Sequence, residues 1–68
     1  MKAISGKQLA TVLKQHGWQC LRVHGSHHIF GKPESTVRLS VPIHGNKALK
    51  VGLLKHLIKL ASLTEDDL

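Results

Sequence analysis

The sequence predicts an α+β fold of order α-β-β-β-α, in which both helices cover one face of a three-stranded antiparallel sheet and leave the other, the open face, bare. Two observations lead to this prediction. The segments at either end carry apolar residues at helical spacing, and those between them are short, strand-like and separated by turn residues. The 68 residues suffice for one domain, residues 1–68, and exclude a two-domain enzyme or a large cofactor-binding fold.

The first helix is expected over roughly residues 6 to 16. Ser5 and Gln8 fit a capping box, in which each side chain accepts a hydrogen bond from the backbone N–H of the other residue. Gly17 is placed to end the helix in the left-handed conformation. The helix start is therefore encoded locally, by residues next to one another in the chain.

Three strands should follow, over Trp18 to His24, His27 to Lys32 and Thr36 to Ile43. Gly25 and Ser26 fit the two central residues of a tight hairpin, where glycine supplies the positive φ that a type II′ turn needs. The next turn is expected at residues 33–35. In the third strand Val37, Leu39, Val41 and Ile43 alternate with Arg38, Ser40, Pro42 and His44. This alternation predicts that one face of the sheet is covered and the other is exposed.

The two-residue turn predicts the register of the first hairpin. It pairs His24 with His27, Val23 with His28, Arg22 with Ile29, and Leu21 with Phe30. On this register Leu21, Val23, His28 and Phe30 face the helices, whereas Arg22, His24, His27 and Ile29 lie on the open face. A slip of one residue would exchange the two sets.

A polar loop, residues 44–47, leads into the second helix. Its apolar stripe follows the i, i+3, i+4 rule through Lys50 (by its aliphatic stem), Leu53, Leu54, Leu57, Ile58 and Ala61. The last residues fit a final helical turn capped by Thr64.

The charge distribution points to a polyanionic partner. Ten Lys and Arg residues stand against four Asp and Glu, and three of those acids lie in the last four residues. Residues 1–64 thus hold all ten basic side chains and one acidic one, Glu34. Such a surface favours phosphate binding, and the scarcity of aromatic residues argues against a module that reads bases by stacking.

No apolar run approaches the roughly 20 residues of a membrane span, and the first five residues lack the apolar segment of a signal peptide. We therefore expect a cytoplasmic protein that does not contact a membrane. Cys20 is the only cysteine, which excludes an intrachain disulfide framework and a cysteine-rich zinc site.

Three of the six histidines, His24, His27 and His28, flank the predicted hairpin turn. On the open face His27 would stand among cations, which favour its neutral form and so its use as a general base near neutral pH. The same cations would attract a phosphodiester and stabilise its transition state. This is a plausible ribonuclease site in which the RNA supplies the nucleophile, its 2′-hydroxyl, and which needs no metal or cofactor.

Three alternatives compete with this reading. His27 can be an ordinary surface histidine. Metal binding is disfavoured because His27 and His28 are adjacent on a strand and project to opposite faces. The whole domain can also be a non-catalytic module that binds RNA and recruits another protein.

Three segments together resemble the HicA (YcfA-like) toxin family. They are Gly-Ser-His-His-Ile-Phe at 25–30, Val-Pro-Ile-His-Gly-Asn-Lys at 41–47, and Gly-Leu-Leu at 52–54 followed by a Leu/Ile-rich helix. The resemblance implies a fold like that of double-stranded-RNA-binding domains. It also implies that the chain is the toxin of a type II toxin–antitoxin system and acts as a ribosome-independent mRNA interferase. Its implied partner is a HicB-like antitoxin that covers the active surface of the toxin.

The family's single catalytic histidine follows the Gly-Ser pair, which implies His27 here. RNA or phosphate contacts are expected from Arg22, His24, Ser26, His28, Arg38, His44 and Lys47. One histidine cannot both accept and donate a proton in a single step. The second proton carrier is therefore open among His24, His28 and His44.

Overall fold

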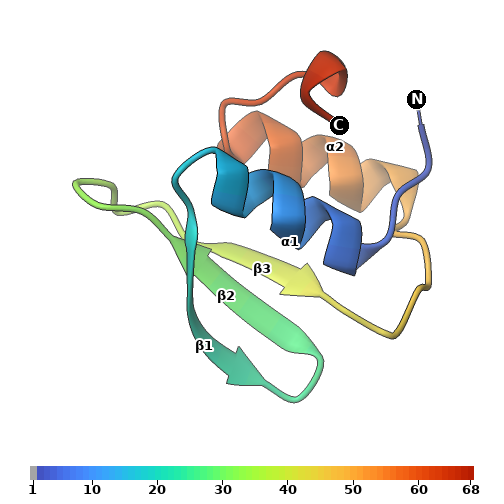
Figure 1. Ribbon diagram of the computed structural model, residues 1–68, viewed down its shortest axis with the longest axis horizontal. Coiled ribbons are helices and arrows are strands. Elements are labelled where there is room, and N and C mark those ends of the chain that lie inside the picture. Colours follow the sequence, from blue (N-terminus) through green and yellow to red (C-terminus); the bar gives the residue numbers. More distant parts are fainter. Residues whose placement is uncertain (1) are drawn as a thin grey trace.

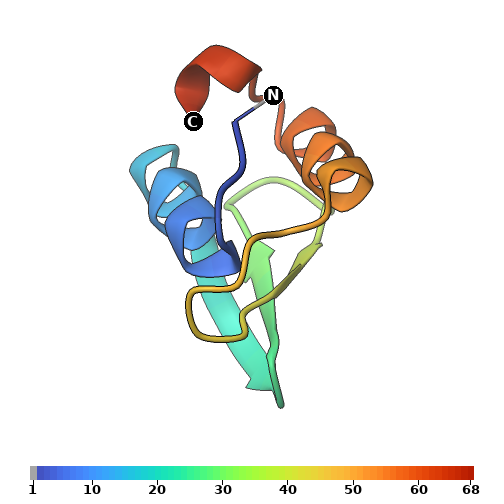
Figure 2. The same ribbon diagram turned by 90° about the vertical axis from the view of Figure 1, so that its right-hand side faces the viewer.

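A computed structural model describes residues 2–68. Its elements are α1 (Gly6–Gln15), β1 (Gln19–His24), β2 (His27–Gly31), β3 (Leu39–Pro42), α2 (Val51–Leu60) and a short 3₁₀ helix, η1 (Glu65–Asp67). The strands form one antiparallel sheet of order β1-β2-β3. Both helices lie on the same side of it (Figures 1 and 2). The predicted α-β-β-β-α order and α+β class are confirmed, and the arrangement fits that of double-stranded-RNA-binding domains.

The start of α1 has the predicted capping box. The Ser5 hydroxyl accepts from the Gln8 backbone N–H at 3.1 Å, and the Gln8 side chain accepts from the Ser5 N–H at 2.9 Å. Gly17 follows the helix with a φ of 91°, in the left-handed region. Both ends of α1 are thus set by the residues that predicted them.

The core lies between the two helices and the covered face of the sheet. It contains Trp18 and Phe30, the only aromatic residues of the chain, both buried. The other buried apolar residues are Ile4, Leu9, Ala10, Leu13, Leu39, Val41, Leu49, Leu54, Leu57, Ile58 and Ala61. Since the two aromatic rings are used in packing, they are not available to stack on bases. No helix within residues 2–68 is long and apolar enough to cross a membrane.

The register of the first hairpin is confirmed near its turn and wrong at its far end. His24 pairs with His27, Val23 with His28 and Arg22 with Ile29, as predicted, but Phe30 pairs with Cys20 instead of Leu21. Leu21 is the extra residue of a β-bulge, and a bulge turns its residue away from the regular alternation. A side chain added at Gly31 would meet the Leu21 side chain, so Leu21 lies on the open face, not on the covered one.

Val23 shares the face of His28, yet about half of its surface is exposed. The reason is visible in Figure 1, where the β1–β2 hairpin extends beyond the two helices. The sequence pattern predicted the face correctly, but it carried no signal of how far the helices reach.

The third strand is shorter than the predicted Thr36 to Ile43, because residues 36–38 are irregular. The Val37 N–H donates to the Ser35 hydroxyl, and the Arg38 guanidinium donates to the Ser35 and Val37 carbonyls. Continued pairing would also bring this segment opposite Pro33, which has no N–H to donate. The predicted alternation still holds where the strand exists, since Leu39 and Val41 are fully buried and Ser40 is exposed.

The C-terminal turn is tied down by Asp67. Its carboxylate accepts from the Thr64 backbone N–H at 2.8 Å and lies 3.6 Å from the His16 imidazole at the end of α1. The Thr64 hydroxyl also contacts this carboxylate, so the final turn is capped by Asp67 together with the predicted Thr64. These bonds, led by the one from the Thr64 backbone, lower the pKa of Asp67.

Replacing Asp67 with Ala should loosen the C-terminal turn without unfolding the domain. A lowered carboxyl pKa stabilises the fold above the ordinary Asp value of about 4, and this contribution is lost as the pH falls through the lowered value. We therefore expect the Thr64 amide to exchange faster in the variant at pH 6, and the difference to shrink as the pH falls below the ordinary Asp value and Asp67 takes up a proton. Asp66→Ala, which removes the same charge one residue away, should leave that exchange rate unchanged.

Candidate functional site

Near the hairpin turn, the open face of the sheet presents a row of three residues, one from each strand. The ladder places His24 beside His27 and His27 beside Pro42. Ser40 and Ile29 form the next row toward the interior of the sheet. Paired residues in antiparallel strands have Cα atoms about 4.5–5.5 Å apart, so a single phosphodiester can contact side chains from all three strands.

His27 is held in one orientation by its neighbour on β3. The ring Nδ1 lies 3.3 Å from the Ser40 hydroxyl, and the side chain is otherwise exposed. A hydrogen bond to one ring nitrogen fixes the orientation of an imidazole and leaves the second nitrogen for a ligand. No other residue among 2–68 makes a side-chain hydrogen bond to His27, so Nε2 is available for proton transfer.

The hairpin turn that carries His27 is fastened to the end of β3. The Ile43 N–H donates to the Ser26 carbonyl at 2.8 Å, immediately beyond the last residue of that strand. Gly25 has a φ of 59°, as the predicted turn requires. The predicted site residue Ser26 is half-buried. Its backbone carbonyl thus attaches the turn before His27 to the end of β3.

Arg22 and Arg38 lie together on the open face, on either side of Ile29. With Leu21 these residues line a shallow depression of about 420 Å³. The Arg38 guanidinium is partly held by the two carbonyls of its own loop, at 3.0 Å each. The bulge at Leu21 supplies an apolar wall that the sequence did not predict at this place. The depression can bind a phosphate and, beside it, an apolar group.

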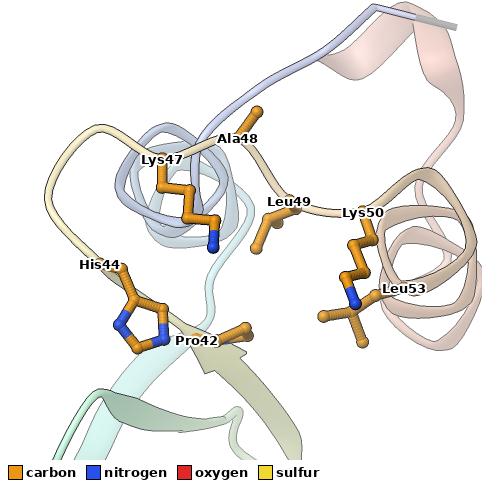
Figure 3. A pocket seen from close by; sticks show the side chains of 7 residues that line it. All are labelled: Pro42, His44, Lys47, Ala48, Leu49, Lys50 and Leu53. Carbon is orange, nitrogen blue, oxygen red and sulfur yellow. The ribbon is translucent and has the colours of Figure 1, made fainter.

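His44 and Lys47 lie in the loop beyond the end of β3, next to Pro42. Together with Ala48, Leu49, Lys50 and Leu53 they line a hollow of about 290 Å³, here called the β3–α2 hollow. Figure 3 shows that the Lys47 and Lys50 side chains extend on either side of Leu49 toward the level of Pro42 and His44. The hollow thus combines an apolar floor with a cationic rim.

His28 is separated from the other predicted site residues, because it points toward the helices. It lines a groove of about 620 Å³, here called the α1 groove, with Lys7, Lys14 and Cys20 among its walls. The structure therefore brings His24, Ser26 and His27 together at the hairpin turn, Arg22 and Arg38 together around Ile29, and His44 together with Lys47. It does not bring His28 to any of these groups.

Two residues of the site were missed by the sequence reasoning. Ser40 was placed on the open face but given no role, because the β2–β3 register was not predicted. Lys50 was assigned to the apolar stripe of the second helix, although its ammonium group lies at the hollow. Two features of the sequence could have indicated a role for Ser40. Its alternation with Leu39 and Val41 places it on the open face, and the hairpin turn places His27 on the same face.

No group of three or more His, Cys, Asp and Glu side chains within residues 2–68 is arranged to hold a metal ion. The side chains that converge on the open face are instead cationic or neutral. Such side chains suit an anionic ligand.

Residues 6–63 match the model of a protein family described as HicA toxin of bacterial toxin-antitoxin. The match covers most of the 68 residues, from the first residue of α1 to beyond the end of α2. It includes every residue of the open face and of the β3–α2 hollow. No curated protein matches the chain.

Proposed function

This chain belongs to the HicA toxin family and is therefore the toxin of a toxin–antitoxin system, and from this we propose that it is a ribosome-independent mRNA interferase whose catalytic residue is His27. The observation that carries the proposal is the exposed imidazole of His27, oriented by Ser40 on the same face of the sheet as Arg22 and Arg38. HicA toxins are generally RNases, and a surface of this charge suits an RNA backbone.

In the proposed reaction the 2′-oxygen of the RNA forms a bond to phosphorus as the bond from phosphorus to the 5′-oxygen breaks. A base takes the proton of the 2′-hydroxyl, and an acid gives a proton to the leaving 5′-oxygen. The products are a 2′,3′-cyclic phosphate and a 5′-hydroxyl. Nε2 of His27 performs one of the two proton transfers, and Arg22, whose partner Ile29 lies two residues along β2, stabilises the charge on the phosphoryl oxygens. Arg38, held beside Gly31, contacts a phosphate further along the RNA backbone.

The second proton carrier is proposed to be His24 or His44. His24 is the cross-strand neighbour of His27, and His44 lies beyond Pro42, so both flank the same stretch of the open face. His28 faces the α1 groove on the other side of the sheet, which removes it from this role.

The partner of the toxin is proposed to be a HicB-like antitoxin of type II, a protein that covers the open face. The half-exposed Leu21 and the flanking Arg22 and Arg38 offer such a partner an apolar contact with complementary charge around it. The proposal places the protein in the cytoplasm, where mRNA and the antitoxin would meet it.

The proposal is tested by incubating purified toxin with labelled RNA in excess chelator. A metal-free ribonuclease should cleave the RNA and leave 2′,3′-cyclic phosphate ends. Binding without cleavage would instead support the non-catalytic RNA-binding module. Cleavage that stops when the chelator is added would contradict the role given to His27.

Replacing Ser40 with Ala should slow cleavage about 3- to 10-fold, because one neutral hydrogen bond that orients a side chain contributes about 0.5–1.5 kcal/mol. We expect kcat to fall and KM to stay unchanged, since Ser40 positions His27 and does not hold the RNA. Ser40→Thr, which keeps the hydroxyl, should restore most of the rate. An equal loss in both variants would show that the strand was disturbed and that the hydrogen bond was unimportant.

A further inference from the structure

The β3–α2 hollow lies next to the proposed catalytic histidine and is built differently from the rest of the cationic surface. Its lining residue Pro42 is the direct cross-strand partner of His27. A group seated in the hollow would therefore be one strand away from the imidazole. On the far side of Pro42, two lysines and a histidine form the rim.

The hollow is held in shape by backbone bonds to the N-terminal segment. The Leu49 N–H donates to the Ile4 carbonyl at 2.8 Å, and Ala48 forms a bridge with Ser5. The Lys47 N–H donates to the His44 carbonyl at 3.0 Å, which closes the turn between these two rim residues. The rim is thus attached to the same segment that caps α1, and it does not need to be ordered when a ligand arrives.

The residues at the start of α2 suit the binding of an anion better than they stabilise the helix. The N-cap position, which usually carries Ser, Thr, Asp or Asn, carries Lys50, and no side chain caps the helix. The first turn also contains no acidic residue. Acidic residues there would stabilise the helix, but they would repel a phosphate from the rim.

The floor of the hollow is apolar. It consists of the buried Leu49, the half-buried Leu53 and the ring of Pro42. A volume of about 290 Å³ is enough for one planar base with part of its sugar. A paired base has its faces covered by stacking and cannot lay one of them on this floor. A nucleotide of RNA has a base with apolar faces and a phosphate on either side of its ribose, so it matches both the floor and the rim.

We propose that the β3–α2 hollow binds one unpaired nucleotide of the RNA beside the cleaved phosphodiester, with its base on Pro42, Leu49 and Leu53 and its phosphates on Lys47 and Lys50. The inference rests on the proposed function, because it takes RNA as the substrate and His27 as the site of cleavage. It adds that the RNA must be single-stranded at this nucleotide, since a base engaged in a pair cannot enter the hollow.

The test measures binding, so that it does not depend on cleavage. The protein carries His27→Ala to keep the RNA intact, and the probe is a labelled RNA oligonucleotide, either single-stranded or annealed to its complement. Lys47→Gln with Lys50→Gln removes the two rim charges. The matched control is Lys7→Gln with Lys14→Gln, which removes the same charge from the α1 groove.

For the single strand, loss of two phosphate contacts should raise Kd about 10- to 50-fold at 0.1 M salt and reduce the slope of log Kd against log salt by about 1.4. The control pair should change Kd less than about 3-fold. The duplex should bind the protein with all its lysines more weakly than the single strand does. Substitution of either lysine pair should change the Kd for the duplex by the same factor.

A second measurement tests the base. Single base-free nucleotides are placed at successive positions of the oligonucleotide, and one position should weaken binding about 5-fold. In the Leu53→Ala variant this difference should vanish, because the floor that contacts the base has been removed.

Equal losses from the two lysine pairs, or equal affinity for duplex and single strand, would overturn the inference. Rim variants that bind RNA normally but lose a HicB-like antitoxin would assign the hollow to that protein instead. A toxin that binds as described but never cleaves would refute the proposed function and leave the nucleotide site standing.

Discussion

The His27→Ala variant should lose RNA cleavage by a factor of about 10² to 10⁴ and should no longer arrest growth. This is the range that a general acid or base contributes to a reaction rate. The variant should stay folded, because His27 is exposed on the hairpin and, within residues 2–68, its side chain bonds to Ser40 alone. Single-turnover cleavage of labelled RNA gives the rate, and thermal unfolding monitored by circular dichroism checks the fold.

The adjacent His28 provides the matched control. It follows His27 directly in β2, but its side chain lies on the opposite face of the sheet, where it lines the α1 groove. His28→Ala should therefore retain most of the cleavage rate. The reverse result, with His28 essential and His27 dispensable, would contradict the site on the open face. Full toxicity of a folded His27→Ala protein would contradict it as well.

The sequence predicted best where neighbouring residues determine the structure. The capping box of Ser5 and Gln8 and the two-residue turn at Gly25 are local features, and both are found as predicted. The two-residue turn also predicted the pairing of His24 with His27. That pairing places His27 on the exposed face of the sheet. The face of the sheet on which His27 lies was therefore predicted correctly from the residues of the turn.

The errors have long-range causes. A bulge at Leu21 adds one residue to β1, and its effect on the facing of side chains cannot be seen in the alternation pattern. The shortened β3 reflects the bonds of Arg38 to its own loop. Neither the Ser40–His27 bond nor the β3–α2 hollow could be predicted, since each joins segments whose pairing becomes known only with the tertiary structure.

The second large effect is expected at Gly6, where α1 packs against the end of β3. A Cβ atom at this position would overlap the backbone carbonyl oxygen of Pro42, and it would also press on Ile43. Backbone atoms cannot swing aside as the end of a side chain can. Gly6→Ala should therefore lower stability by about 1–3 kcal/mol, equivalent to a fall in Tm of roughly 5–20 °C for a domain of this size.

The same clash should reduce cleavage, even below the new Tm, because Pro42 is the cross-strand partner of His27 and Ile43 fastens the hairpin turn. Gly52→Ala is the matched control: a Cβ atom there meets nothing within 4 Å, and the residue lies in α2. That change should leave cleavage unaltered and raise stability by up to about 1 kcal/mol. If Gly6→Ala were as harmless as Gly52→Ala, the close contact between α1 and β3 would be wrong. Displacement of Pro42 should move the strand that orients His27. Unchanged cleavage in a destabilised Gly6→Ala protein would therefore contradict the role given to this strand in positioning His27.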